Sequence, residues 1–162
     1  MTDSPALQVT TPSDREVRVI RTFSARRELV FRAWTEPDLV KRWLAGPEGW
    51  SITKSEGDPR PGGTYRLEWS GIDNAFMGMT GTYREIEPPE RIVSVEAFDE
   101  AWHPGEAIVT TEFLADGPNE TTVVMTILYE SKEARDIAVT TGMTDGMIVT
   151  YQSLDRLLAE IG

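Results

Sequence analysis

Hydrophobic and polar residues alternate through the middle of the chain with the period of two that is typical of β-strands. In the segment 65–69, Tyr65, Leu67 and Trp69 alternate with charged residues, so one face of this strand is expected to be buried and the other solvated. The same pattern continues in the segments 76–87, 91–98, 106–114 and 121–129, and an earlier strand is predicted over 15–23. Turns rich in proline and glycine separate these segments, which predicts an antiparallel meander.

Helical spacing replaces this alternation near both ends of the chain. Directly after the first strand, Ser24 is predicted to cap a short helix over 25–34, and Thr35 to begin a capping box for a second short helix. Ser131 is predicted to cap another helix near the C-terminus. The segment 143–161 carries the clearest amphipathic pattern. Its apolar positions are Met143, Met147, Tyr151, Leu154, Leu158 and Ile161.

This order of elements predicts an α+β fold. We expect a curved antiparallel sheet of about six to seven strands, wrapped around a long C-terminal helix, with two short helices after the first strand. Because a straight helix touches a curved sheet unevenly, a pocket is expected between them. The polar residues 1–14 are expected to form a flexible N-terminal tail, and residues 15–162 a single domain.

Four groups of residues follow one another in an order that is typical of one superfamily. They are Phe23, Ala25, Val30, Phe31, Ala33, Trp34, Thr35, Pro37, Val40 and Trp43; then Arg60 to Gly63 with Tyr65; then Gly81, Tyr83, Glu85, Ile86 and Pro88 to Ile92; and last Gly142, Met143, Gly146, Tyr151, Leu154, Leu157 and Leu158. This ordered set spans residues 15–161. It resembles the START-like (SRPBCC) helix-grip superfamily, and within it the bacterial branch related to the C-terminal domain of the activator of the heat-shock-protein-ninety ATPase.

The resemblance implies the helix-grip fold more directly than it implies a function. Many relatives carry proline where this chain has Arg26, but the first turn of a helix accepts either residue. Relatives include lipid and polyketide binders, aromatic-polyketide cyclases, a toxin-neutralising protein and co-chaperone-like domains. A shared fold does not select among these activities.

Charge and composition exclude several classes of partner. The net charge of −11 repels phosphate backbones, so no nucleic-acid partner is expected. No run of about 18 apolar residues occurs, so no membrane insertion is expected. The absence of cysteine fits a reducing compartment, and we expect a cytoplasmic protein. A homodimer is left open by the sequence.

Few residues in the sequence suggest metal or acid–base chemistry. His103 is the only histidine and there is no cysteine, so no metal and no cofactor are expected. We interpret His103 as a histidine in a surface turn that could place a polar group at the pocket mouth. Glu68, Glu85, Glu96 and Glu112 lie in predicted strands, where two of them could form an acid–base pair, but a solvated outer face is the preferred interpretation.

Methionine and aromatic residues are the predicted lining of the pocket, because methionine adapts to varied apolar shapes. The predicted ligand-binding residues are Trp69, Met77, Met79, Phe98, Trp102, His103, Met143, Met147 and Tyr151. The alternative is that these residues form ordinary core.

Three functions are compatible with this sequence. The first is a protein that binds an apolar or aromatic, lipid- or polyketide-like molecule without catalysis. The second is a cyclase- or dehydratase-type enzyme that acts on such a molecule. The third is a co-chaperone-like interaction domain. A buried carboxylate, tyrosine or histidine in the pocket would favour the enzyme, whereas an almost wholly apolar lining would favour the binding protein.

Overall fold

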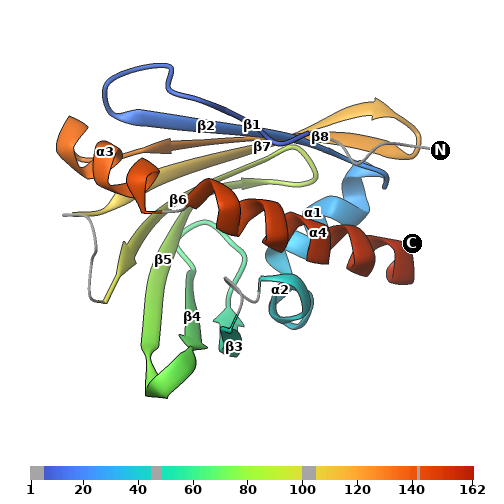
Figure 1. Cartoon of the computed structure of the whole chain (residues 1–162). Coiled ribbons are helices and arrows are strands. Elements are labelled where there is room, and N and C mark those ends of the chain that lie inside the picture. Colours follow the sequence, from blue (N-terminus) through green and yellow to red (C-terminus); the bar gives the residue numbers. More distant parts are fainter. Residues whose placement is uncertain (1–5, 45–48, 100–104, 142) are drawn as a thin grey trace.

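A single curved antiparallel sheet forms most of the protein. The computed structural model describes residues 6–44, 49–99, 105–141 and 143–162. Within these residues the sheet has eight strands in the order β1-β2-β8-β7-β6-β5-β4-β3 (Figure 1). The strands are β1 (Gln8–Thr10), β2 (Glu16–Phe23), β3 (Ser51–Gly57), β4 (Thr64–Ser70), β5 (Phe76–Glu87), β6 (Arg91–Phe98), β7 (Ala107–Gly117) and β8 (Glu120–Leu128).

The helices occupy the two places where the sequence pattern becomes helical. They are α1 (Arg27–Thr35), α2 (Pro37–Trp43), α3 (Lys132–Thr140) and α4 (Met143–Ile161), and a single 3-10 turn (Ile72–Asn74) joins β4 to β5. The α+β architecture, with two short helices after the first long strand and a long C-terminal helix, is confirmed.

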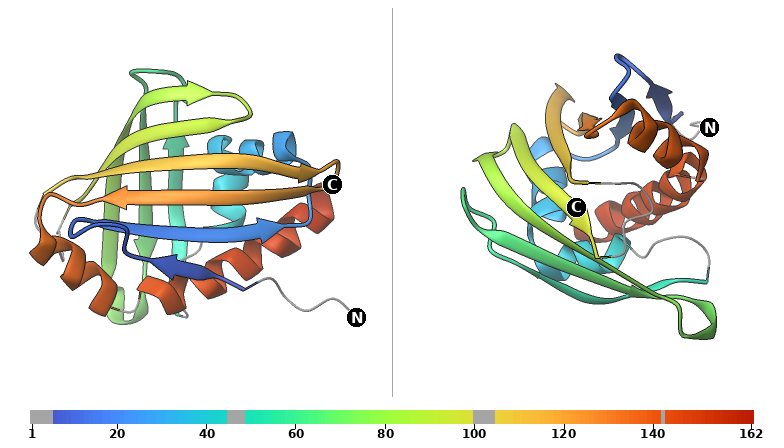
Figure 2. Two further views of the ribbon diagram at one scale, coloured as in Figure 1. Left: turned by 90° about the horizontal axis from the view of Figure 1, so that it is seen from above. Right: turned by 90° about the vertical axis from the view of Figure 1, so that its left-hand side faces the viewer.

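The sheet is a meander from β3 to β8, and β2 then pairs with β8, which places the first long strand beside the last. This pairing curls the sheet, and α4 lies across its concave side (Figure 2). Tyr151, Leu154 and Leu158 on α4 are buried, as the amphipathic pattern predicts, and Met147 is half-buried. The side chain of Met143 lies outside the described part of the chain.

The predicted caps of the first two helices are wrong. α1 begins after Arg26 without a side-chain cap, so Ser24 does not cap it. Thr35 still belongs to α1, and its hydroxyl donates to the carbonyl oxygen of Phe31 at 3.0 Å. α2 begins with Pro37 after the N-cap residue Glu36 and has no side-chain cap, so Thr35 does not cap it. The cap on α3 is confirmed, because Ser131 Oγ accepts a hydrogen bond from the backbone N–H of Ala134 at 3.0 Å.

Two strands were not predicted from the sequence. β1 lies inside the segment 1–14 that was expected to be a flexible tail, and it pairs with β2 through Val9 and Val19. β3 forms the opposite edge of the sheet and is mostly exposed. The domain boundary at residue 15 stays a prediction.

Candidate functional site

A pocket of about 640 Å³ lies between the first half of α4 and the concave face of the sheet. Its lining is predominantly apolar, and it comes from all four helices and from strands β3 to β8. Representative lining residues are Val40 and Trp43 on α2, Trp69 on β4, Met79 on β5 and Met147 on α4. The pocket is therefore built by elements from nearly the whole length of the chain.

The two halves of α4 explain why the pocket lies where it does. In the second half, the large side chains of Leu154 and Leu158 are almost fully buried and fill the space against the sheet. In the first half, Gly146, Met147 and Thr150 line the pocket, and a Cβ atom on Gly146 would meet nothing within 4 Å. The helix therefore leaves space only along its N-terminal half.

An aromatic cluster separates the pocket from the packed core. The rings of Trp34 and Trp43 lie 4.8 Å apart between centroids, and Tyr151 lies 5.9 Å from Trp34. Phe23 and Phe113 pack edge-on against the other side of Trp34, at 6.2 Å and 5.5 Å. Edge-to-face packing of this kind fixes ring positions, so this wall is expected to be rigid.

The structure brings six of the nine predicted binding residues into the lining of this one pocket. They are Trp69, Met77, Met79, Phe98, Met147 and Tyr151. The indole N–H of Trp69 donates to the carbonyl oxygen of Leu44 at 2.8 Å, which orients its ring. Trp102, His103 and the side chain of Met143 lie outside the described residues. A role in ligand binding stays a prediction for all nine.

A small polar cluster within the lining was missing from the predicted site. The hydroxyl of Tyr65 donates to Oε2 of Glu96 at 2.5 Å, and the same hydroxyl lies 3.1 Å from Ser94 Oγ. All three residues line the pocket. Among the described residues, no other side chain forms a hydrogen bond to Glu96.

Small residues on the neighbouring strands make room for this cluster. Glu96 on β6 lies opposite Gly81 on β5 and Ala107 on β7. A Cβ atom on Gly81 would overlap the ring of Tyr65. The ring therefore crosses β5 over this glycine, and in that position its hydroxyl reaches the carboxyl group on β6.

Burial controls the ionisation of the groups in this cluster. Loss of hydration raises the pKa of Glu96, and the hydrogen bond from Tyr65 offsets part of that rise. Burial, followed by the negative charge of Glu96, also raises the pKa of Tyr65. The same two causes raise the pKa of Tyr83 and that of Tyr129 to about 12 each. The pocket thus holds one carboxyl group that resists ionisation, beside tyrosines that stay neutral.

The expectation that Glu96 is solvated on the outer face is wrong. Strand β6 has apolar residues on both faces, with Ile92 and Phe98 on the same side as Glu96, and Val93 and Val95 on the other. The alternation therefore cannot decide which face is buried. The signal that could have found the site is Gly81, because a glycine within a strand often marks the close approach of another group.

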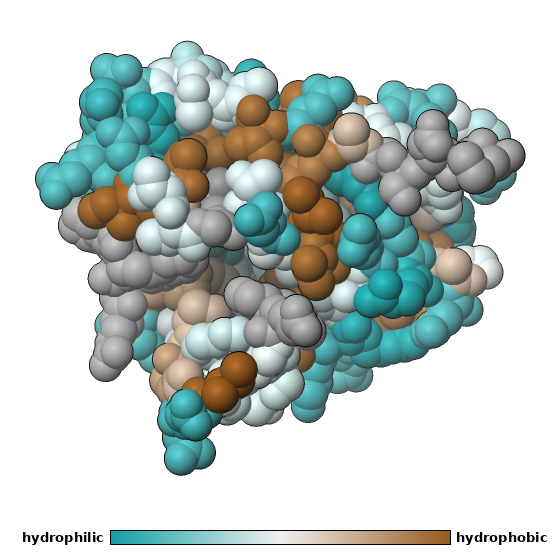
Figure 3. All heavy atoms as spheres, in the orientation of Figure 1, coloured by the Kyte–Doolittle hydropathy of each residue, from teal (hydrophilic) through white to brown (hydrophobic). Residues whose placement is uncertain are grey.

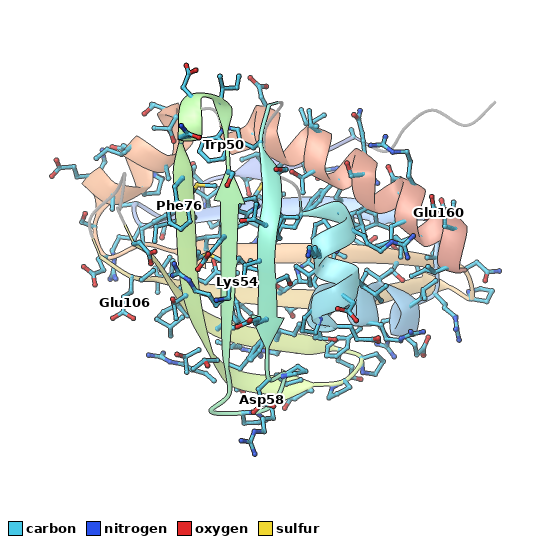
Figure 4. The ribbon with its side chains drawn as sticks, turned by 90° about the horizontal axis from the view of Figure 1, so that it is seen from below. Trp50, Lys54, Asp58, Phe76, Glu106 and Glu160 are labelled. Carbon is cyan, nitrogen blue, oxygen red and sulfur yellow. The ribbon has the colours of Figure 1, made fainter. Side chains whose placement is uncertain are left out.

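Among the described residues, exposed large apolar side chains are grouped in two places, apart from Leu114 on β7. Over the helices, Val139 on α3 and Ile148 and Val149 on α4 are exposed (Figure 3). At the β4–β5 hairpin, Ile72 and Phe76 are exposed, and Phe76 also lines the pocket. Trp50 and Phe76 lie toward this hairpin end of the sheet, with Asp58 at the other end of β3 (Figure 4). One end of the pocket is therefore lined by residues close to this hairpin.

Two negative findings apply to the described residues. They contain no group of three or more histidine, cysteine, aspartate or glutamate side chains arranged to hold a metal ion. No helix among them is both long enough and apolar enough to cross a membrane.

Comparison with known proteins identifies the family and supports the fold. The family model described as Activator of Hsp90 ATPase homolog 1-like protein matches residues 24–159. A Rhodobacter sphaeroides protein of known structure is 32% identical, and the match covers 95% of this chain and 98% of that one with a TM-score of 0.89. A Chromobacterium violaceum protein is 26% identical, with coverages of 90% and 98% and a TM-score of 0.71.

More distant matches support the fold alone. A protein from Arthrobacter aurescens is 21% identical, with coverages of 94% and 91% and a TM-score of 0.82. The search of curated proteins gives no match.

Proposed function

The chain belongs to the family of Activator of Hsp90 ATPase homolog 1-like proteins, and from this premise we propose that it binds a small apolar or aromatic molecule in the pocket between α4 and the sheet. The observation that carries the proposal is the pocket of about 640 Å³ with its mainly apolar lining. Pockets for small molecules commonly have volumes of about 300 to 1,000 Å³ and combine apolar walls with a few polar groups.

The expected affinity follows from the area that a ligand would bury. Burial contributes roughly 25 cal/mol per Å², so about 200 Å² of apolar ligand surface gives about 5 kcal/mol. Association costs of similar size oppose this gain. Additional ring contacts with Trp69 and Tyr151, which both line the pocket, favour aromatic ligands. We therefore expect affinities no tighter than micromolar, because a micromolar dissociation constant already requires a net gain of about 8 kcal/mol.

The proposal is tested by two measurements on the same preparation. Native mass spectrometry of freshly purified protein should reveal a co-purified small molecule. Titration of the emptied protein with Nile red, a neutral apolar dye, should give a saturable rise in fluorescence that the recovered molecule reverses. If no molecule co-purifies and Nile red does not bind, the proposal is wrong.

A second candidate is an enzyme that transfers a proton to or from a molecule in this pocket, as a cyclase- or dehydratase-type reaction would require. The observation that favours it is the carboxyl group of Glu96, held by Tyr65 within the lining. A carboxyl group with a raised pKa is an effective general acid or base near neutral pH. NMR in D₂O would test this function, because catalysed exchange of a ligand C–H should disappear in Glu96→Gln.

A further inference from the structure

Among the residues that the structure describes, the charged side chains in the pocket lining are all acidic. Among the described lining residues there are three carboxylates, Glu56, Glu96 and Asp99, and there is no lysine, arginine or histidine. Asp99 is already paired, because Arg66 donates to both of its oxygens at 2.5 and 2.6 Å. Glu56 is exposed, and its Oε2 lies 3.9 Å from Nζ of Lys54. Glu96 alone lines the pocket without a cationic partner among the described residues.

Three tyrosines line the pocket together with this carboxyl group. Tyr65 contacts it directly, and the ring of Tyr83 lies 4.8 Å from that of Tyr65 between centroids. Tyr129 also lines the pocket, and the charge of Glu96 acts on both Tyr83 and Tyr129. The faces of aromatic rings carry negative potential and attract cations. The mainly apolar pocket therefore also offers a carboxyl group and three tyrosine rings.

We propose that the pocket receives a hydrophobic amine, with its apolar or aromatic body against Trp69 and Met79 and its protonated amino group against Glu96 and the tyrosine rings. This inference rests on the proposed function, because it names the class of ligand for the same pocket. An anionic ligand such as a fatty acid is disfavoured, since its carboxylate would meet Glu96 inside a protein of net charge −11.

The energetic reason is that a carboxylate withdrawn from water without a cationic partner is costly, and a cation that reaches it offsets this cost. A charge-assisted hydrogen bond is roughly twice as strong as a neutral one. An amine should therefore bind this site more tightly than an alcohol of the same shape, and a carboxylate should bind less tightly than the alcohol.

Binding of an amine should depend on pH in a defined direction. The cation favours the ionised form of Glu96, whose pKa is raised by burial, so affinity rises as pH increases through that pKa and then levels off. In the described part of the chain, the titratable groups that interact with Glu96 are Tyr65 on β4, Tyr83 on β5 and Tyr129 after β8, all with raised pKa values and all neutral in this range. A simple amine stays protonated up to about pH 9, as lysine does.

Three probes of one shape test the proposal: 2-(1-naphthyl)ethylamine, 2-(1-naphthyl)ethanol and 1-naphthylacetic acid. In calorimetric titration at pH 7, the amine should bind most tightly, the alcohol less tightly and the acid least. We expect the affinity for the amine to exceed that for the alcohol by about tenfold and that for the acid by about a hundredfold. Between pH 5 and 9 the affinity for the amine should rise, whereas the affinity for the acid should fall.

The Glu96→Gln variant should remove this preference, because it keeps the shape and the hydrogen bond from Tyr65 but has no charge. The three probes should then bind within about threefold of one another, and alcohol binding should persist as evidence of an intact pocket. The matched control is Glu85→Gln, since Glu85 is an exposed carboxylate on β5 outside the pocket lining. This control should bind the three probes with the same order of affinities as the wild type.

The outcomes separate the two proposals. An acid that binds as tightly as the amine, or a preference that survives Glu96→Gln, overturns the amine proposal and leaves the binding proposal intact. The same holds if Nile red binds but no naphthyl probe does. If neither the probes nor Nile red bind, both proposals fail.

Discussion

Glu96 connects the stability of the fold to pH, because its carboxyl group is harder to ionise in the folded protein than in the unfolded chain. Below the unfolded-state pKa of about 4.3, the group is protonated in both states and carries no penalty. As pH rises, this carboxyl group ionises first in the unfolded chain, so the free energy of unfolding falls. The fall ends when the pH passes the raised pKa of the group in the folded state. The group is therefore a source of instability at neutral and alkaline pH.

We predict that Glu96→Gln increases the free energy of unfolding at pH 8 and leaves it nearly unchanged at pH 4. Glutamine can still accept the hydrogen bond from Tyr65 but does not need to ionise. Urea denaturation at the two pH values measures the effect. The exposed Glu85→Gln variant should show no such dependence on pH, and an equal gain at both pH values in Glu96→Gln would contradict the explanation.

Gly81 provides a second prediction for a single residue. A methyl group there would overlap the ring of Tyr65, so Gly81→Ala should displace that ring and lower the free energy of unfolding by about 1 to 3 kcal/mol. Gly117→Ala is the matched control on β7, where a Cβ atom would meet nothing within 4 Å. That control should change stability by less than about 1 kcal/mol. Urea denaturation measures both variants. If they lower the free energy of unfolding equally, the close approach of the Tyr65 ring is not the reason for glycine at position 81.

At the scale of elements, α4 is joined to the sheet by a pair of opposite charges as well as by apolar packing. Arg21 on β2 is 4% exposed and donates to both oxygens of Asp155 on α4, at 2.9 and 2.5 Å. The guanidinium also lies 4.6 Å from the ring centroid of Phe23. A second ion pair on α4, between Glu160 and Arg42 on α2, is exposed on both sides.

We predict that Asp155→Ala lowers the free energy of unfolding by about 2 kcal/mol, because it leaves the buried guanidinium of Arg21 without its carboxylate and with only the carbonyl oxygen of Thr22 as an acceptor. Glu160→Ala should cost less than about 1 kcal/mol, since an exposed pair contributes little. Urea denaturation of the two variants makes the comparison. The paired replacement Arg21→Met with Asp155→Leu should recover much of the loss; if it is as unstable as Asp155→Ala, an unpaired charge is not the cause.

The same elements show how much the sequence can predict. α4 was predicted to its ends because its amphipathic pattern is long, and long periodic patterns define a helix well. β3 was missed because it is an edge strand with mostly exposed residues, so it carries no apolar alternation. Glu96 was misplaced because the burial of a strand face depends on its neighbours in the sheet. That information lies in the pairing with Gly81 and Ala107 and not in the segment 91–98.

For the whole molecule, the pocket is the feature on which both functional proposals depend. We predict that Met147→Trp weakens Nile red binding by about tenfold or more while the protein stays folded, because a larger side chain would occupy the space beside α4. Ile148→Trp is the matched control one residue further along α4, where the side chain is exposed. Calorimetry gives the affinities and circular dichroism the folding. If both variants bind the dye like the wild type, the pocket is not its site.

Some expectations at this scale stay predictions. They are the location in the cytoplasm, a homodimer, the lack of nucleic-acid partners, and the independence of the fold from metal. Treatment with a chelator should leave the melting temperature unchanged. A fall that zinc reverses would contradict the last of these expectations.

The space beside α4 also affects how the protein should respond to hydrostatic pressure. Unfolding removes internal voids, so the unfolded chain with its water occupies a smaller volume, typically by about 20 to 100 mL/mol, and compression favours that state. Any part of the pocket of about 640 Å³ from which the apolar lining excludes water adds to this volume change. A molecule held in the pocket would reduce that change, and so an occupied protein should withstand compression that unfolds an empty one.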